Sequence, residues 1–460
     1  MAPCVQELHF PTLTIPITID HVTAVMPAGP IPAASGDTLY LSNLDDIIGA
    51  RVFTPTVHFY QSNRSSNSDT LPSITKSIRD ALAGVLVPYY PFSGRLRETQ
   101  NGKLEVFFGP DQGALMVEAH TDMALAQLGD LAVPNPAWLP LIYRFPDEGP
   151  YKVIDMPLVI AQVTLFSCGG FSLGLRLCHC LCDGFGAMQF LGAWAATAKT
   201  GAVVTNPPPR WNREFFWPRN PPAVKFPHTE FMRKEETSTL TACLWRAKPV
   251  QKCYRISPEF QARLKTSAQP DDDFGCSTFD AMAAHVWRSW VKALDVMPPE
   301  NELRLTFSVN GRGKMERPPL EEGFYGNVVC VACAVSTVEE LVGGRLSETT
   351  LLVREARAGV TEEYVRSTVD YVEVERPARL EFGGKLTITQ WTRFCMYERA
   401  DFGWGRPVYA GPIDLTPTPQ VCVFLPEREV EGRASGSAMV VCICLPESAV
   451  DRFKEYLSAC

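Results

Sequence analysis

The segment 157–198 restricts the possible folds more than any other part of the chain. Its first half, 157–178, contains two apolar runs joined across Gly169-Gly170, a dipeptide that favours a β-hairpin turn. Its second half, 185–198, has no proline and is rich in Ala, Leu and Met, which predicts a buried helix. Between strand and helix lies the hexapeptide HCLCDG, residues 179–184. A rigid scaffold can hold a reactive side chain in a cleft at such a junction.

The remaining elements predict an α/β protein. Strand-like and helical segments occur in both halves of the chain without a regular βαβ repeat, which favours mixed β-sheets flanked by helices. Strands are expected at 54–60, 104–109, 114–120, 303–310 and 328–335, and helices at 73–87, 276–294, 347–368 and 448–457.

Length and composition predict two domains. A chain of 460 residues exceeds the size of one average domain of about 150 residues. Composition changes at 206–222, where prolines are interspersed with aromatic residues and arginines. Such a segment favours an extended, semi-rigid crossover over a helix or strand. The sequence therefore predicts an N-terminal domain over 1–205, a linker over 206–225 and a C-terminal domain over 226–460.

Charge and cysteine content restrict the partners. The net charge of −8 without a basic run argues against nucleic acid as a partner and against a polybasic membrane anchor. No apolar run approaches the about 18 residues of a membrane span. Fifteen cysteines, mostly within apolar strand-like runs, are expected to be buried and reduced, as in a cytoplasmic protein.

His179 and Asp183 are the first candidates for chemistry. On spacing alone, a buried and hydrogen-bonded structural pair is as good an interpretation as a catalytic one. The junction and the following Gly184 favour a catalytic base. A neutral imidazole, with an ordinary pKa of about 6.5, can accept a proton near neutral pH.

A zinc site is an alternative that the spacing disfavours. Cys178, Cys180 and Cys182 alternate, so an extended chain would direct them to one side. Structural zinc sites use paired Cys-x-x-Cys turns. Cys330 and Cys333 are expected on opposite faces of a strand instead. We therefore expect no metal.

A cysteine nucleophile is a minor alternative. Cys180 or Cys182 would have to pair with His179, and side chains so close in sequence rarely align. No third residue that could orient such a pair is evident. A cysteine- or zinc-dependent hydrolase is thus the weaker enzymatic hypothesis.

Two glycine-containing loops complete the candidates. Asp401-Phe402-Gly403-Trp404-Gly405 is typical of a turn in which glycines adopt positive φ and aromatic rings pack. We interpret it as architectural. The segment 310–314 lacks the Gly-Lys-Ser/Thr end of a phosphate loop. Its Arg312 and Lys314 remain candidates for a carboxylate partner or a coenzyme phosphate.

Together these motifs resemble the BAHD acyl-CoA-dependent acyltransferases of plant specialised metabolism. His179-x-x-x-Asp183-Gly184 matches the His-x-x-x-Asp-Gly motif of that family, and 401–405 matches its Asp-Phe-Gly-Trp-Gly motif without a change. Supporting blocks are LSNLDD at 41–46, YYPFSGRLRE at 89–98, GFYGN at 323–327 and VTEEYVRS at 360–367. The chain is most similar to the alcohol acyltransferase branch, which contains benzyl alcohol O-benzoyltransferase-like enzymes and piperine or piperamide synthase-like, amide-forming members.

The resemblance implies a fold. We expect two chloramphenicol-acetyltransferase-like domains joined by a long crossover, with a segment of the second half packed on the first domain. A solvent channel between the domains would make His179 reachable from both faces. The Cys180-Leu181-Cys182 interior of the motif differs from the Thr, Ser, Met or Ile that relatives more often carry.

The resemblance also implies a mechanism. His179 would be the general base, Thr389 would stabilise the oxyanion, and Trp391 and Gly184 would line the substrate pocket. Asp183 would pair with Arg312 and shape the loop. Asp401, Gly403, Trp404 and Gly405 would likewise shape a loop.

The implied reaction moves an aromatic or hydroxycinnamoyl-like acyl group from CoA to a hydroxyl or amine of a small metabolite. Acyl-CoA is a co-substrate, no cofactor is bound permanently, and the protein is expected to be a cytoplasmic monomer. The alternative is a non-catalytic relative that acts through protein contacts.

Overall fold

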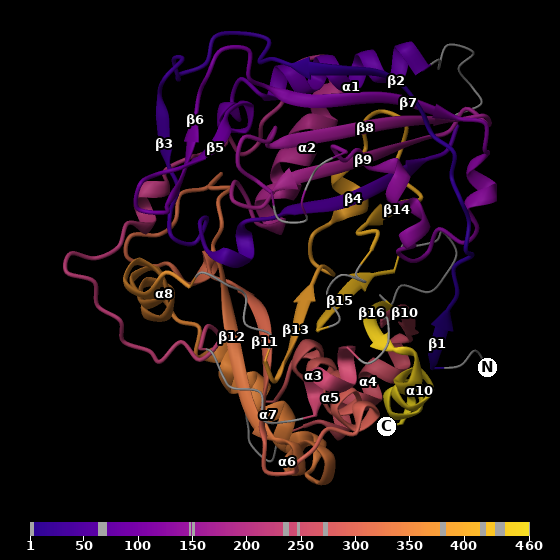
Figure 1. Ribbon diagram of the computed structural model, residues 1–460, viewed down its shortest axis with the longest axis vertical. Helices are drawn as coiled ribbons and strands as arrows, with labels where there is room; N and C mark the ends of the chain where they lie inside the picture. Colours follow the sequence, from indigo (N-terminus) through magenta and orange to yellow (C-terminus); the bar gives the residue numbers. More distant parts are fainter. Residues whose placement is uncertain are drawn as a thin grey trace.

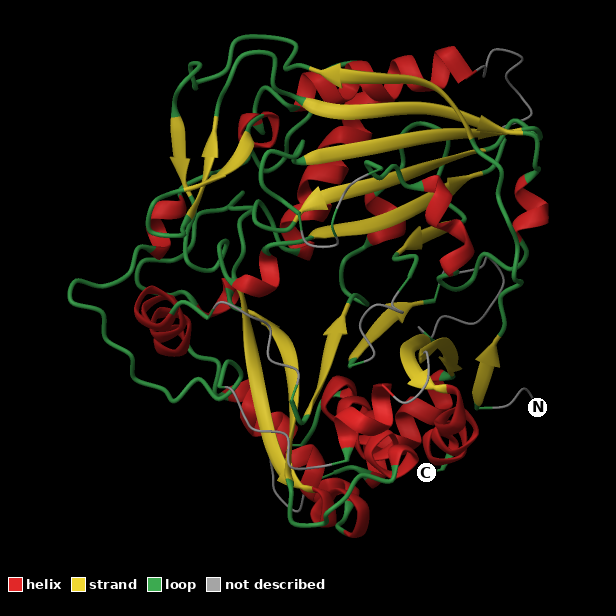
Figure 2. Cartoon of the chain, in the orientation of Figure 1, coloured by secondary structure: helices red, strands yellow, loops and turns green. Residues whose placement is uncertain are grey.

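The protein is built around two β-sheets with helices on their outer faces (Figure 2). The computed structural model describes residues 4–62, 71–146, 149, 152–232, 239–245, 249–269, 275–377, 383–414, 420–427 and 438–459. The expected α/β class with mixed sheets is confirmed, because both sheets contain parallel and antiparallel pairs.

The first sheet has six strands in the order β14-β4-β9-β8-β7-β2. Helices α1 (Leu71–Val85) and α2 (Gly184–Thr200) pack side by side against it (Figure 1). The two central strands are buried along almost their whole length, as the apolar runs before the hexapeptide predict. The strands are β14 (Tyr409–Gly411), β4 (Phe53–Tyr60), β9 (Phe171–Cys178), β8 (Val159–Phe166), β7 (Ala114–Thr121) and β2 (Thr18–Val25).

The second sheet has seven strands in the order β1-β10-β16-β15-β13-β11-β12. Its strands are β1 (Val5–Leu8), β10 (Pro249–Ile256), β16 (Met439–Pro446), β15 (Val421–Pro426), β13 (Lys385–Gln390), β11 (Glu302–Asn310) and β12 (Val329–Thr337). The helices of this half are α3 (Leu240–Trp245), α4 (Pro258–Ser267), α5 (Thr278–Leu294), α6 (Val338–Gly343), α7 (Leu346–Ala358), α8 (Glu362–Glu375), α9 (Met396–Arg399) and α10 (Val450–Ser458).

Two strands cross between the halves. β14, from the second half, pairs antiparallel with β4 of the first sheet, and β1, from the start of the chain, pairs with β10 of the second. The expected return of a second-half segment to the first domain is therefore present. The predicted domains are consecutive segments, so they group β1 with the first sheet and β14 with the second. In the structure each of these strands belongs to the other sheet.

The proline-rich segment runs outside the two sheets. Figure 1 shows it as a long loop that passes around α8. Within the described range 152–232, it forms no strand and no helix apart from a short 3-10 turn at Arg213–Phe216. This agrees with the prediction of a crossover without long regular elements.

Two predicted elements differ from the structure. The single helix expected at 347–368 is two helices, α7 and α8, because α7 ends at Gly359 and the hydroxyl of Thr361 accepts a hydrogen bond from the Tyr364 N–H to begin α8. The strand expected at 104–109 does not continue the first sheet. As β6 (Leu104–Phe107) it pairs with β3 (Thr38–Tyr40) and β5 (Arg95–Glu98) in a separate small sheet.

The first sheet contains a fully buried histidine, His58, whose pKa is lowered. His58 of β4 lies opposite Leu173 of β9 and Ala410 of β14. Complete burial lowers its pKa to about 4, although a backbone hydrogen bond at Leu173 acts in the opposite direction. Below pH ~6.5 the unfolded chain binds a proton here that the folded chain takes up only near pH 4.

We expect His58→Leu to reduce the loss of stability in mild acid. The folded pKa is depressed, so the stability associated with His58 is lost as the pH falls from about 6.5 towards 4. Between about pH 7 and about pH 5 the wild type should lose about 2 kcal/mol through this group. Urea unfolding at the two pH values measures the loss. An equal loss in wild type and variant would contradict the assignment.

Candidate active site

The hexapeptide forms the turn between β9 and α2. β9 ends at Cys178 and α2 begins at Gly184, as the sequence predicts. Asp183 is the N-cap of α2, and its Oδ1 accepts a hydrogen bond from the Gly186 N–H at 3.0 Å. The turn is closed by a hydrogen bond from the Leu181 N–H to the Cys178 carbonyl at 3.1 Å. The cysteines at 178, 180 and 182 are therefore not on one extended strand.

Asp183 is committed to structure. Arg312 donates from Nη1 to Oδ2 at 2.7 Å and from Nη2 to Oδ1 at 2.9 Å, so the expected pair is present and bidentate. Oδ2 also accepts from the Val328 N–H at 3.0 Å. With its side chain 1% exposed, the carboxylate has no face left for a substrate. It holds the start of α2 to the second sheet.

His179 is held through its backbone. Its N–H donates to the Val52 carbonyl at 2.9 Å, and its carbonyl accepts from Asn327 Nδ2 at 2.8 Å. The residue is half-buried. Within the described part of the chain, the buried ring atom Nδ1 has no hydrogen-bond partner. Asn327 lies in the GFYGN block, yet nothing in the sequence singled it out as a contact of His179.

The start of α2 also meets the segment that follows β13. A Cβ atom added to Gly184 would lie 2.2 Å from the ring of Phe394, so only glycine permits this approach. The rings of Phe394 and Phe185 meet edge to face, with centroids 5.2 Å apart. The centroids of the Phe394 and Trp391 rings are 5.7 Å apart. Thr389, at the end of β13, is half-buried. The structure thus brings the stretch that contains Thr389 and Trp391 to the junction.

The Asp-Phe-Gly-Trp-Gly motif at 401–405 lies at the C-terminal end of α2. Asp401 Oδ2 accepts from Lys199 Nζ at 2.6 Å, and its Oδ1 accepts from the Gly403 and Gly405 N–H groups at 3.0 and 3.1 Å. Burial opposes ionisation of Asp401, but the bonds from Lys199 and Gly403 lower its pKa overall. Lys199 lies about 22 Å along the helix from Gly184 at 1.5 Å per residue. The motif therefore does not reach His179.

Aromatic contacts support an architectural interpretation of this loop. Gly403 and Gly405 both have positive φ, 108° and 85°, which favours glycine. Phe402 is buried against Trp194 of α2, with ring centroids 5.3 Å apart, and Trp404 meets Phe171 of β9 at 5.3 Å. These contacts attach the loop to the first sheet.

A cavity of about 330 Å³ adjoins this loop. Its lining contains side chains of α2 and α9 and the beginning of the crossover, and His179 does not belong to it. The lining includes Tyr89, Gln189, Lys199, Pro207, Arg399 and Asp401. The cavity is therefore associated with the Asp401 loop and not with the junction.

The two thiols of the hexapeptide are buried, and their pKa values are raised. Cys180 and Cys182 are buried, and Cys180 Sγ contacts the Ala50 carbonyl at 3.2 Å. A hydrogen bond with Cys178 and burial raise the pKa of Cys180, and burial raises the pKa of Cys182. Because the thiolate is the nucleophile, these shifts oppose a cysteine mechanism. The described residues contain no cluster of side chains arranged to hold a metal ion.

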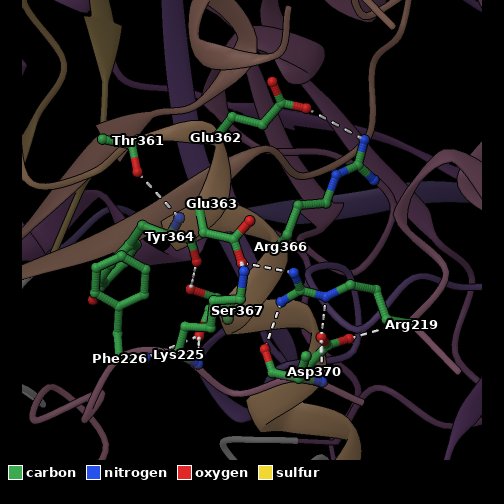
Figure 3. Close-up of polar contacts among 12 residues, drawn as sticks. Arg219, Lys225, Phe226, Thr361, Glu362, Glu363, Tyr364, Arg366, Ser367 and Asp370 are labelled. Carbon is green, nitrogen blue, oxygen red and sulfur yellow. Dashed lines mark hydrogen bonds and ion pairs between the residues drawn. The ribbon is translucent and has the colours of Figure 1, made fainter. Parts of the chain in front are cut away.

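The crossover is clamped to α8 (Figure 3). Arg219 donates to Asp370 at 2.5 Å and to Glu363 at 2.6 Å, and Lys225 lies 3.3 Å from Glu363. Ser367 Oγ accepts from the Lys225 N–H at 2.9 Å. The VTEEYVRS block and the crossover thus supply polar partners to each other.

Beside this clamp, Ser367, His228 and Glu230 are aligned like a hydrolase triad. Ser367 Oγ lies 2.9 Å from His228 Nε2, and His228 Nδ1 lies 2.8 Å from Glu230. All three residues are buried. Ser367 Oγ already accepts two backbone hydrogen bonds, so its proton is donated to His228. The alignment is a structural staple without access for a substrate.

Comparison with known proteins identifies the class of this protein, which has two mixed sheets, a histidine at a strand–helix junction and an aspartate that fixes that junction. The chain belongs to the Transferase family, the BAHD acyltransferases. The model of this family matches residues 15–459.

Plant acyltransferases are similar to this chain along most of their length. The omega-hydroxypalmitate O-feruloyl transferase of Arabidopsis thaliana is 36% identical over 90% of this chain and 88% of its own. Alcohol acyl transferase 1 allele RGb of Malus domestica is 36% identical over 93% and 91%. The fatty alcohol:caffeoyl-CoA acyltransferase of Arabidopsis thaliana is 35% identical over 84% and 87%. The alternative of a non-catalytic binding protein gains no support from these relatives.

Solved structures share the fold. Vinorine synthase superposes with a TM-score of 0.70 at 21% identity, covering 95% of this chain and 96% of its own. TRI101 of F. sporotrichioides, complexed with coenzyme A and T-2, superposes with a TM-score of 0.74 at 16% identity, covering 91% and 97%. The prediction of the fold is confirmed. None of the helices in the described part of the chain is long and apolar enough to cross a membrane.

Proposed function

We propose that this acyltransferase moves an acyl group from coenzyme A to the hydroxyl of a small alcohol, with His179 as the general base. One observation supports the assignment of roles: both carboxylate oxygens of Asp183 already accept hydrogen bonds, from Arg312, Gly186 and Val328. The imidazole is therefore left as the titratable group of the motif that can act on a substrate. Its Nδ1 is buried, so Nε2 is the nitrogen we assign to the proton transfer.

The reaction needs no covalent enzyme intermediate. His179 Nε2 takes the proton of the acceptor hydroxyl as the oxygen attacks the thioester carbonyl carbon. The tetrahedral oxyanion collapses, the carbon–sulfur bond breaks, and the imidazolium returns its proton to the departing thiolate of CoA. The names of the relatives and of the coenzyme A complex support CoA as the carrier and a hydroxyl as acceptor. An amine would use the same base.

Thr389 is our proposed donor to the oxyanion, and its removal should slow the chemical step. Thr389→Val keeps nearly the same shape and removes the hydroxyl. We expect kcat to fall by about 10²-fold or more with little change in KM, because the donor acts on charge that forms in the transition state. Thr387→Val is the matched control on the same face of β13, where the hydroxyl instead contacts Thr306 at 2.8 Å. Equal kcat values for the two variants would contradict the role.

The test of the function is a matrix assay. Acetyl-, benzoyl- and hydroxycinnamoyl-CoA are offered against short and long alcohols and against amines, with release of free CoA thiol and product mass as readouts. We expect ester formation that requires acyl-CoA and resists EDTA, with an aromatic or hydroxycinnamoyl donor preferred. Amide products without esters would overturn the proposed acceptor. Thioester hydrolysis without an acceptor would overturn the transfer itself.

The proposal includes a cytoplasmic monomer with no nucleic-acid or membrane partner. The net charge of −8 supports the absence of a polyanionic partner. Light scattering of the purified protein tests the oligomeric state.

A further inference from the structure

We infer that Asn327, together with the buried Arg213–Asp45 pair, is a positioning device for the base: it orients His179 through the backbone of the turn and not through the imidazole ring. The inference rests on the proposed function, because it assumes that His179 is the base. It assigns a role to Asn327, Arg213 and Asp45, which lie outside the two motifs at 179–184 and 401–405.

The need for such a device follows from the ring itself. In a Ser-His-Asp arrangement the second ring nitrogen is hydrogen-bonded to the acid, which fixes the tautomer and the orientation of the imidazole. Here Asp183 is used elsewhere, and the buried Nδ1 of His179 has no partner among the described residues. A base misplaced by about 1 Å can lose 10²-fold in rate. The backbone contacts of residue 179 must therefore supply the precision.

Asn327 grips the turn at His179. Its Nδ2 donates both to the His179 carbonyl at 2.8 Å and to Asp45 Oδ1 at 2.9 Å. Its backbone N–H donates to the same Asp45 oxygen at 2.9 Å. The amide is thus fixed on one side by a buried carboxylate and holds the base on the other.

Arg213 contacts the same turn two residues later, at Leu181. Its Nη2 donates to the Leu181 carbonyl at 2.7 Å, and its Nε lies 3.0 Å from Asp45 Oδ2, with both side chains fully buried. The guanidinium also lies over the ring of Trp211 at 4.0 Å. A Cβ atom on Gly326 would come within 2.4 Å of the guanidinium, so the glycine before Asn327 makes room for it.

The Asp45 carboxylate therefore connects three segments to the turn at 179–184 (the catalytic turn). Asp45 accepts from Asn327 through Oδ1 and from the Ser42 hydroxyl at 2.7 Å through Oδ2, the oxygen that also faces Arg213. The LSNLDD block, the crossover and the GFYGN block meet at this point. The carbonyls of residues 179 and 181 are both held, while the N–H of residue 179 is held from the other side by Val52.

The chain offers a matched control for Asn327. Asn43 is also buried, and its Nδ2 also donates to one backbone carbonyl and one carboxylate, at Val369 (2.8 Å) and Glu373 (2.9 Å). Its carbonyl partner belongs to α8 and not to the catalytic turn. Loss of either amide should cost similar stability, but only loss of Asn327 should change the chemistry.

The experiment compares Asn327→Ala with Asn43→Ala in the full-length protein. We expect similar urea midpoints for the two variants. For Asn327→Ala, kcat should fall by about 10- to 100-fold with little change in KM, because the misplaced base acts on the transition state and not on binding. For Asn43→Ala, kcat should remain near the wild-type value. Equal kcat values for the two variants, whether high or low, overturn the inference.

A second pair covers the case in which Asn327→Ala does not fold. Arg213 and Arg219 both lie in the crossover, and each pairs with a buried aspartate, Asp45 and Asp370 respectively (Figure 3). Arg213→Lys and Arg219→Lys both keep a cation beside that aspartate. The lysine at 213 cannot hold Asp45 and the Leu181 carbonyl together. We expect a lower kcat for Arg213→Lys alone, and equal kcat values overturn the inference.

His179→Ala in the same assay separates the two levels of the argument. If it keeps its turnover, the proposed general base is wrong and the inference is wrong with it. If it is inactive while Asn327→Ala behaves like Asn43→Ala, only the positioning device is wrong.

Discussion

His179→Ala should be folded and almost inactive. General acid–base catalysis contributes about 10²- to 10⁴-fold to a rate, so kcat should fall by that factor in an assay of CoA thiol release. Stability should change by less than about 1 kcal/mol, because the described residues make no hydrogen bond to the buried Nδ1. The backbone bonds of residue 179 to Val52 and Asn327 do not depend on the ring.

A surface histidine gives the control for this variant. His120 of β7 contacts Asp20 at 2.9 Å and is exposed. His120→Ala removes a histidine from a His–Asp contact without touching the turn, and should keep wild-type kcat. Near-normal turnover of His179→Ala would show that the reaction proceeds without this base.

Asp183→Ala should unfold far more easily than the wild type. The substitution removes the acceptor of both Arg312 nitrogens and of the Gly186 and Val328 N–H groups. Breaking a buried ion pair by removing one partner costs about 3 to 5 kcal/mol, since the remaining charge loses its compensation. We expect a loss of that size in the free energy of unfolding, measured in urea, and poor expression at higher temperature.

Asp370→Ala is the matched control for the loss of stability. Asp370 is also buried and accepts from an arginine, Arg219, and from the Arg219 and Ala223 N–H groups (Figure 3). It should cost a comparable amount of stability while the folded fraction keeps its kcat. If Asp183→Ala were as stable as the wild type and as inactive as His179→Ala, Asp183 would be a catalytic group and our assignment would be wrong.

Local elements could be predicted from the sequence because their signals are contiguous. The hairpin and helix on either side of the hexapeptide appear where the apolar runs and the Gly169-Gly170 turn predict them. The helix α5 likewise begins after Ser277, whose hydroxyl accepts from the Asp280 N–H. The break between α7 and α8 was missed although Gly359 and Thr361 are ordinary signals for a helix end and a helix start.

Contacts between distant segments were not predictable from local pattern. The pairing of β14 with β4, and of β1 with β10, joins segments that lie hundreds of residues apart. The Asp183–Arg312 pair came from the resemblance to a family, since the bare spacing left a His179–Asp183 pair equally open. Asn327 and Asp45 are 282 residues apart, and no periodicity connects them. Only the fold brings them to His179.

The division of labour between His179 and Asp183 can be tested by restoring the base. His179→Gly leaves space at the turn for free imidazole, which can replace the lost side chain as proton acceptor. We expect kcat of this variant to rise with imidazole concentration and to saturate, and to follow the unprotonated fraction of imidazole as the pH is raised, while Asp183→Ala gains nothing. A His179→Gly variant with wild-type turnover in the absence of imidazole would contradict the account.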